Sequence, residues 1–404
     1  AKKGAKAATW MNRGKVYFEA VEAPTKDLAE NIPQNVFEIA VGKPKQVGTE
    51  TIAGQEFTTL VYPYFVAYVS NGNIVGWKQT RDIQRGLLQN AVKSYNKAYE
   101  LDPKQGPKVR QALDAIVNFC KKKANIGINV GDYKGASDAF AQAYDIETSP
   151  VYESADASYL FYAGRLAAVL GQNEPEMFVK GAGYLERALE AGYCDEEGSL
   201  YYYLFHCYYG QREADRAFVI KSRDALLEGI AKYPKNELIL DGLMNLYTAE
   251  EGMGDPKDLV GMIDEALAND PENIDLWYGR GRVYFKLQDY DECIKSFKEV
   301  VKLRPEDSQG FYLLGVFYMS KAEALLNEIN ERHYTTQAEY DKDSNAAILL
   351  YKDAIPYFEK AIELKPDDVN SIDLIKQIYF RFRDEDGNQA KYDYYNQRLS
   401  ELRG

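Results

Sequence analysis

Histidine is nearly absent from this sequence, which holds 2 histidines, His206 and His333, among 404 residues. Neither lies near a cysteine or serine in an arrangement that suggests nucleophilic catalysis. Carboxylates are abundant, but no pair of them stands out as a poised acid and base. The sequence therefore predicts a protein that is not an enzyme.

Cysteine is also scarce. The 4 cysteines, Cys120, Cys194, Cys207 and Cys293, have no C-x-x-C spacing and no histidine-rich neighbourhood. This pattern disfavours a zinc site, and we expect neither a metal nor a cofactor. We expect buried, unpaired thiols. The alternative is a disulfide between Cys194 and Cys207, the pair that is close in sequence.

Long apolar runs and an excess of basic residues are missing as well. No stretch reaches the roughly 18 apolar residues that span a bilayer, so we expect a soluble chain without membrane insertion. The net charge of −13 argues against nucleic acid or anionic lipid as a partner. Ala1 to Ala8 are small or basic and follow no initiator Met. This start predicts the mature N-terminus of an exported, periplasmic protein; the alternative is a cytoplasmic chain trimmed for expression.

Apolar and aromatic residues, by contrast, are plentiful. Hydrophobic residues make up 46% of the chain and charged residues 27%, so enough apolar surface exists to offset the entropy of the chain along its whole length. Tyrosine dominates the aromatic residues, with 33 Tyr against 17 Phe and 3 Trp. A tyrosine ring can pack while its hydroxyl meets water or a ligand, so this excess favours a wide, ligand-facing surface.

Helix-ending prolines recur along the chain. Similar segments precede Pro103 (KAYELDP), Pro271 (EALANDP), Pro305 (EVVKLRP) and Pro366 (KAIELKP), and Pro234 closes a fifth segment. Each is typical of an amphipathic helix that a proline ends and a polar turn follows. The interval from Pro271 to Pro305 is 34 residues, which indicates a structural repeat.

The residues between these two prolines match the pattern W-x2-L-G-x2-Y, A-x3-F and P. The matching positions are Trp277, Arg280, Gly281, Tyr284, Cys293, Phe297 and Pro305. This run resembles the tetratricopeptide repeat (TPR) family, with Cys293 where the family prefers Ala. The resemblance implies an all-α, right-handed superhelical solenoid of antiparallel helix pairs, in which small residues let the helices approach and large rings fill the space between pairs. By this alignment the chain holds about eight units.

The first repeat is interrupted. Trp10 and Tyr17 mark its opening helix, within residues 1–21. The second half of this repeat, from Ala91 to Pro103, lies some sixty residues further along the chain than the repeat pattern predicts. We therefore expect an inserted module at 22–83.

The remaining chain, residues 84–404, is expected to continue the solenoid. At about 308–366 two lengthened helices should form a protruding hairpin, joined by a polar link from His333 to Ser344. The last unit, 369–404, lacks a terminal proline and is expected to be the C-terminal cap.

The inserted segment is rich in residues that favour strands. Thr49–Val61 and Val66–Lys78 are predicted strand regions, broken at Ala53-Gly54 and at Asn71-Gly72, and an Asn-Gly pair indicates a tight hairpin. A short helix is predicted at Pro33–Val41, ended by a Gly-Lys-Pro stop. This combination resembles the small α+β domain of bacterial outer-membrane assembly lipoproteins.

Two interpretations of the insert stay open. It is a side module that stabilises the solenoid by covering its first helix. Alternatively it is a second docking surface, with Tyr62, Tyr64, Tyr68 and Trp77 partly exposed.

The TPR resemblance also implies which residues line the concave surface. They are Lys15, Phe18, Lys121, Asn125, Asn129, Phe161, Arg165, Tyr202, His206, Asn245, Tyr278, Arg282, Phe285, Lys286 and Tyr312. These residues are aromatic, amide and basic, with few acids. Such a surface suits an extended, acidic peptide, because amides bond its backbone and Arg or Lys pairs with its carboxylates.

Lys121 and Asn125 also resemble the start of the carboxylate clamp of TPR cochaperones. Tyr162, Ser199 and Tyr203 stand where that clamp needs Asn, Lys and Arg, which puts this mode of binding in doubt. The resemblance as a whole implies a non-catalytic scaffold that binds a protein or peptide partner, here expected in a bacterial envelope. The alternative is a small-ligand or glycan-binding protein that uses the tyrosine-rich groove.

Overall fold

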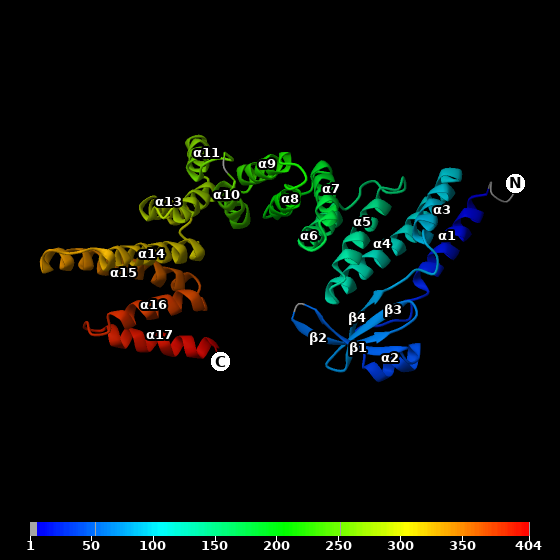
Figure 1. Ribbon diagram of the computed structural model, residues 1–404, viewed down its shortest axis with the longest axis horizontal. Coiled ribbons are helices and arrows are strands. Elements are labelled where there is room, and N and C mark those ends of the chain that lie inside the picture. The colour runs from blue at the N-terminus through cyan, green and yellow to red at the C-terminus, as the bar shows by residue number, and fades with distance from the viewer. Residues whose placement is uncertain (1–5, 53, 251, 404) are drawn as a thin grey trace. The chain divides into compact units, whose positions relative to one another are not determined.

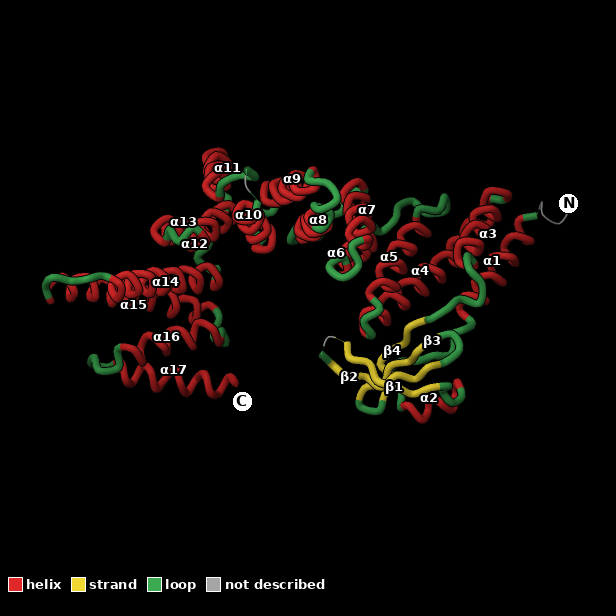
Figure 2. Tube along the Cα trace, viewed as in Figure 1, coloured by secondary structure: helices red, strands yellow, loops and turns green. Residues whose placement is uncertain are grey.

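The structure is a computed structural model that describes residues 6–52, 54–250 and 252–403. It divides into two compact units, Ala1–Ala225 and Leu226–Gly404. Helices dominate both units, and the strands form one sheet near the N-terminus (Figures 1 and 2). No helix in the described part of the chain is long and apolar enough to cross a membrane.

The first unit contains a four-stranded sheet among helices that pack mostly in antiparallel pairs. Its elements are α1 (Ala7–Glu22), α2 (Gln34–Val41), β1 (Gln46–Ile52), β2 (Gln55–Val61), β3 (Phe65–Ser70), β4 (Asn73–Gln79), α3 (Leu87–Leu101), the short 3-10 helix η2 (Pro103–Gln105), α4 (Gly106–Asn129), α5 (Tyr133–Glu147), α6 (Ser158–Leu170), α7 (Glu176–Glu190) and α8 (Ser199–Tyr209). Helix α9 (Ala217–Lys232) contains the boundary between the two units.

Helices α1 and α3 pack together although the inserted module separates them in sequence. A Cβ atom on Gly14 would lie 2.8 Å from the Cε1 atom of Tyr95, so the glycine permits the close approach of the two helices. Ala91 and Ala98 are fully buried in the same core. The two helices therefore form one pair, with the sheet inserted in the connection between them.

The sheet is an antiparallel meander in the order β1-β2-β3-β4. Asn71 and Gly72 join β3 to β4 with φ angles of 48° and 76°, the left-handed values that a tight two-residue hairpin requires, which confirms the predicted turn. Helix α2 ends at Gly42, as predicted, with φ at 89°. The predicted break before β2 includes Ala53, which lies outside the described residues; Gly54 has φ at 81°.

The sheet packs against α4, whereas one of the two interpretations of the insert placed it over the first helix. A Cβ atom on Gly76 of β4 would lie 2.8 Å from the Cγ1 atom of Val130, directly after α4. Lys78 forms an ion pair with Asp132 at 3.4 Å. The other face of the sheet packs on α2 through Phe37, whose ring contacts Phe65 edge to face at 6.4 Å.

Three of the four insert aromatics that were predicted to be partly exposed are buried. Tyr62, Tyr68 and Trp77 expose 6%, 3% and 8% of their surface, whereas Tyr64 is half-buried. The hydroxyl of Tyr62 donates to the carbonyl of Gly42 at 3.0 Å, and that of Tyr68 to Glu50 at 2.9 Å. The rings therefore belong to the core of the module.

The regular elements of the second unit, within its described residues, are all helices. They are α10 (Glu237–Ala249), α11 (Pro256–Asn269), α12 (Ile274–Lys286), α13 (Tyr290–Leu303), α14 (Ser308–Glu331), α15 (Gln337–Leu364), α16 (Val369–Arg381) and α17 (Asn388–Arg403). Helix α13 ends shortly before Pro305, as the repeat spacing predicts. Cys293 is fully buried, which raises the pKa of its thiol, so it packs as a small apolar residue.

Helices α14 and α15 form the predicted long hairpin, but the link between them is shorter than predicted. The sequence predicts a polar link from His333 to Ser344, whereas α15 already begins at Gln337. The hydroxyl of Thr336 accepts from the backbone N–H of Glu339, whose carboxylate in turn accepts from the N–H of Thr336. This reciprocal cap starts the helix early, because it satisfies two N–H groups that would otherwise lack a partner.

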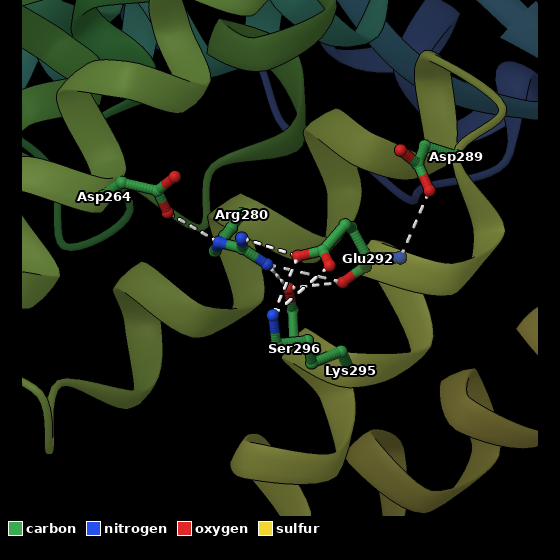
Figure 3. Close-up of polar contacts among 6 residues, drawn as sticks. All are labelled: Asp264, Arg280, Asp289, Glu292, Lys295 and Ser296. Atoms are coloured by element: carbon green, nitrogen blue, oxygen red, sulfur yellow. Dashed lines mark hydrogen bonds and ion pairs between the residues drawn. The ribbon is translucent and has the colours of Figure 1, made fainter.

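Arg280 links three helices of the second unit (Figure 3). Its Nε donates to Asp264 of α11 at 2.6 Å, and its two Nη atoms donate to Ser296 and Glu292 of α13, each at 2.8 Å. Its side chain is 9% exposed. The buried guanidinium therefore fixes α12 against α11 and α13, at a position where the repeat pattern has Leu.

Candidate binding groove

A cavity of about 740 Å³ lies on the surface of the first unit, between α4 and α6. We call it the α4–α6 cavity and define it by Lys121, Asn125 and Ile128 of α4, Tyr133 and Phe140 of α5, and Tyr159, Tyr162, Arg165, Leu166 and Val169 of α6. The α4 members recur at helical spacing and so share one face of that helix. The volume lies within the range of about 300–1,000 Å³ typical of ligand sites.

Two cations of the α4–α6 cavity lack a carboxylate partner in the part of the chain that the structure describes. Lys121 Nζ lies 5.4 Å from the centroid of the Tyr159 ring, and Arg165 Cζ lies 5.6 Å from that of Tyr203. Among the described residues, no carboxylate oxygen lies within 4.0 Å of either basic group. The side-chain hydrogen bond with Tyr159 raises the pKa of Lys121, so the ammonium is charged at neutral pH. Both cations are therefore available to an anionic ligand.

Aromatic and apolar side chains complete the cavity. The ring of Phe140 lies 6.4 Å from that of Tyr159 and 5.5 Å from that of Tyr162, centroid to centroid. Tyr162 is 41% exposed, and Ile128 and Val169 are exposed as well. A partner that covers this cavity would remove apolar surface from water while its anionic groups meet the two cations.

Three of the predicted groove residues of the first unit meet in this cavity: Lys121, Asn125 and Arg165. Others do not. Phe18 and Phe161 are buried in the core, with 8% and 6% of their surface exposed, and neither lines the cavity. Lys15 and Asn129 are exposed and lie outside the residues that line the cavity.

The remaining two predictions of the first unit lie on α8. The rings of Tyr202 and His206 meet edge to face, 4.4 Å apart. Burial lowers the pKa of His206, so at neutral pH it is an uncharged ring and adds no positive charge to the groove.

In the second unit the expected basic surface is neutralised by acids from the neighbouring helix. Arg282 forms an ion pair with Glu237 of α10 at 2.5 Å, and Lys286 forms one with Asp241 at 2.8 Å. Asn245, a predicted groove residue, continues this row of α10 and is exposed. The expectation of few acids is therefore wrong here: a peptide carboxylate would have to displace Glu237 or Asp241.

The predicted aromatics of the second unit contribute mainly to packing. Tyr278 is 5% exposed, and its hydroxyl donates to Asp307. Phe285 is half-buried and packs on Phe317, with 4.9 Å between ring centroids. Tyr312 is half-buried beside Phe358, and burial raises the pKa of its hydroxyl. None of these three side chains is exposed to solvent in a way that would let it bind a partner.

Sequence reasoning missed most of the aromatic wall of the α4–α6 cavity. Tyr159, Tyr162, Leu166 and Val169 recur at helical spacing along α6, which is the available signal. Alignment with the carboxylate clamp hides this row of side chains, because Tyr162 stands there only as a departure from the Asn of the clamp. The two acids of α10 carried a similar signal, since Glu237 and Asp241 lie four residues apart, in line with Asn245.

Other kinds of site find no support in the described residues. None of the four cysteines, all of which lie in the described ranges, forms a disulfide, so the alternative of a bridge between Cys194 and Cys207 is wrong. No group of three or more His, Cys, Asp or Glu side chains in the described ranges could hold a metal ion.

Comparison with known families identifies the repeats. A model of the tetratricopeptide repeat matches residues 274–307, and a second model of the same repeat matches residues 83–105 and 350–368. The first match covers α12 and α13, and the second covers α3 and the end of α15. The chain therefore contains tetratricopeptide repeats, as its sequence predicted, and such repeats imply a binding or scaffold role.

Similarity to individual proteins is distant. Interferon-induced protein with tetratricopeptide repeats 2 from Cricetulus griseus is 30% identical over 157 residues, which are 39% of this chain and 30% of that protein. The chain thus matches less than a third of the length of this curated relative.

Comparison with solved structures gives two further distant similarities. The human IFIT1 dimer with m7Gppp-AAAA has a TM-score of 0.34 and 17% identity, over 76% of this chain and 68% of that one. A TPR repeats protein from Bacteroides fragilis has a TM-score of 0.27 and 15% identity, over 65% of this chain and 97% of that one.

Proposed function

We propose that the chain is a non-catalytic scaffold that binds an extended, acidic segment of a protein partner, and that the α4–α6 cavity holds this segment. The observation that carries the proposal is the pair of cations, Lys121 and Arg165, which lack a carboxylate within 4.0 Å among the described residues and lie among tyrosine rings. The tetratricopeptide repeats support a protein or peptide as the partner.

The chemistry of the α4–α6 cavity defines the segment. An Asp or Glu side chain would accept from Lys121 or Arg165, in a charge-assisted hydrogen bond that is stronger than a neutral one. A neighbouring aromatic or apolar side chain would pack on the exposed ring of Tyr162 and on Val169. The Asn125 amide can bond the peptide backbone, which fixes an extended conformation.

The experiment is fluorescence anisotropy with two labelled peptide libraries. In one library two Asp residues are fixed beside a Phe, and in the other two Asn residues take their place. We expect the acidic library to bind and the Asn library to bind at least about tenfold more weakly, since each hydrogen bond to a charged group contributes about 1.5–3 kcal/mol.

Two variants locate the binding. Lys121→Ala with Arg165→Ala should weaken binding of the acidic library at least about tenfold. Lys108→Ala is the matched control, because this lysine is exposed on the same helix, outside the cavity. Equal affinity of the double variant and the unchanged protein, with both folded by circular dichroism, would refute the proposal.

A second candidate function is the binding of a neutral glycan in the same cavity. It is favoured by the exposed ring of Tyr162 near Tyr133 and Tyr159, because tyrosine rings stack on sugars and their hydroxyls bond sugar hydroxyls. Calorimetry against an oligosaccharide panel tests it. Heats that persist in the Lys121→Ala, Arg165→Ala variant and vanish in Tyr162→Ala would establish the glycan; a panel without heats would remove it for those sugars.

A further inference from the structure

A second pocket, of about 380 Å³, lies where the inserted module meets α4. We call it the insert pocket. Its walls come from the segment that follows α1, from β4 and from α4, on a different face of α4 from the one that lines the α4–α6 cavity. The Gly76 contact and the Lys78–Asp132 ion pair hold the sheet against this end of α4, so packed elements build the walls.

Positive charge gathers in the insert pocket. Lys26, Lys122 and Lys123 all line it, and no carboxylate oxygen in the described part of the chain lies within 4.0 Å of their ammonium groups. Two acids share the lining: Asp132 already pairs with Lys78, which leaves Glu22 as the carboxylate that opposes three lysines. A local excess of positive charge stands out in a chain whose net charge is −13.

Two aromatic rings, one buried and one half-buried, lie beside this charge. Trp77 and Phe119 both line the pocket, and Lys122 Nζ lies 5.4 Å from the centroid of the Trp77 ring. An anion that pairs with Lys122 therefore lies close to the indole ring of Trp77. The remaining part of the same ligand would contact the half-buried ring of Phe119 and the part of Trp77 that lines the pocket, where an aromatic ring can pack.

We propose that the insert pocket binds a small anion carried on an aromatic ring, either an aromatic carboxylate or an aromatic phosphate ester. The lysines hold the anionic group, and Trp77 and Phe119 hold the ring. The volume of about 380 Å³ suits a small molecule and lies near the lower end of ligand sites. This site is separate from the α4–α6 cavity and does not depend on the function proposed there.

The test is isothermal titration calorimetry of the full chain with three probes: 2-naphthoate, 2-naphthyl phosphate and the neutral 2-naphthamide. We expect at least one anion to bind, and the amide to bind at least about tenfold more weakly, because it cannot pair with lysine. Absence of heat with both anions at millimolar concentration would overturn the proposal. So would equal affinity for the amide.

Variants assign the probe to this pocket. Lys122→Ala with Lys123→Ala should weaken the anion at least about tenfold. Lys93→Ala with Lys108→Ala is the matched control, since both lysines are exposed and line neither the insert pocket nor the α4–α6 cavity. The proposal fails if the first variant binds as the unchanged protein does, or if the control alone loses binding.

Discussion

The Arg280 cluster of the second unit supports a quantitative prediction about stability. Arg280→Ala removes the guanidinium and leaves Asp264, Glu292 and Ser296 without their partner (Figure 3). Breaking a buried ion pair on one side costs about 3–5 kcal/mol. The Asp264 and Glu292 side chains are 46% and 31% exposed, so water can hydrate the charges that remain. We therefore expect a loss of about 2–3 kcal/mol.

Hydrogen exchange measured by mass spectrometry is the suitable assay, because a chain with two units need not unfold in one step. A loss of 2–3 kcal/mol corresponds to a fall of about 30- to 150-fold in the protection of peptides from α12 and α13. Lys295→Ala is the control: its side chain is 65% exposed and contacts Glu292 only at the surface, so protection should change by less than about threefold.

A triple variant separates lost charge pairing from lost packing. Arg280→Leu with Asp264→Asn and Glu292→Gln restores the Leu of the repeat pattern and removes the two charges, so protection should return to within about 1 kcal/mol of the unchanged protein. The reasoning is refuted if Arg280→Ala lowers protection no more than Lys295→Ala does.

Three further predictions concern packing, hydrogen bonding and pH. Gly281→Ala should destabilise the second unit by about 1–3 kcal/mol, because its Cβ would lie 2.5 Å from the Cδ2 atom of buried Phe297; Gly261→Ala, with open space around it, should not destabilise α11, and exchange in both helices checks this. Tyr152→Phe removes a 2.7 Å hydrogen bond to Asp114 and should cost about 1–2 kcal/mol in urea unfolding of the first unit; an unchanged midpoint would contradict it. The hydrogen bond from Arg280 lowers the pKa of Glu292 below its usual 4.5. The stabilisation is therefore complete above about pH 4.5 and is lost as the pH falls through the lowered value. Exchange of α12 and α13 against pH should show this loss, and Glu292→Gln should remove it.

Local patterns predicted the fold well where the determinants are close in sequence. The proline spacing gave the ends of α11 and α13, and the Asn71-Gly72 pair gave the β3–β4 hairpin. The early start of α15 depends on the cap between Thr336 and Glu339, a local signal that the predicted polar link overlooked. The envelope location and the likeness of the insert to an assembly lipoprotein domain stay predictions.

The candidate site was harder to predict because its chemistry depends on contacts between distant residues. Arg282 and Lys286 have the same residue types as Lys121 and Arg165, yet only the first two meet acids, which come from a helix about 45 residues earlier. Likewise Trp77 is buried because the sheet packs on α4, which no pattern within the insert could indicate. Composition showed that cations and rings exist, whereas packing decides which of them face a partner.

The most direct measurement of the central claim is photo-crosslinking from the α4–α6 cavity. A photoreactive phenylalanine analogue replaces Tyr162 in one sample and Tyr340 in another; each tyrosine is 41% exposed, but Tyr340 lies on α15 of the second unit. With the labelled acidic peptide library, position 162 should give crosslinks that Lys121→Ala with Arg165→Ala abolishes, and position 340 should give none. Equal crosslinking from both positions, or none from 162, would contradict the account.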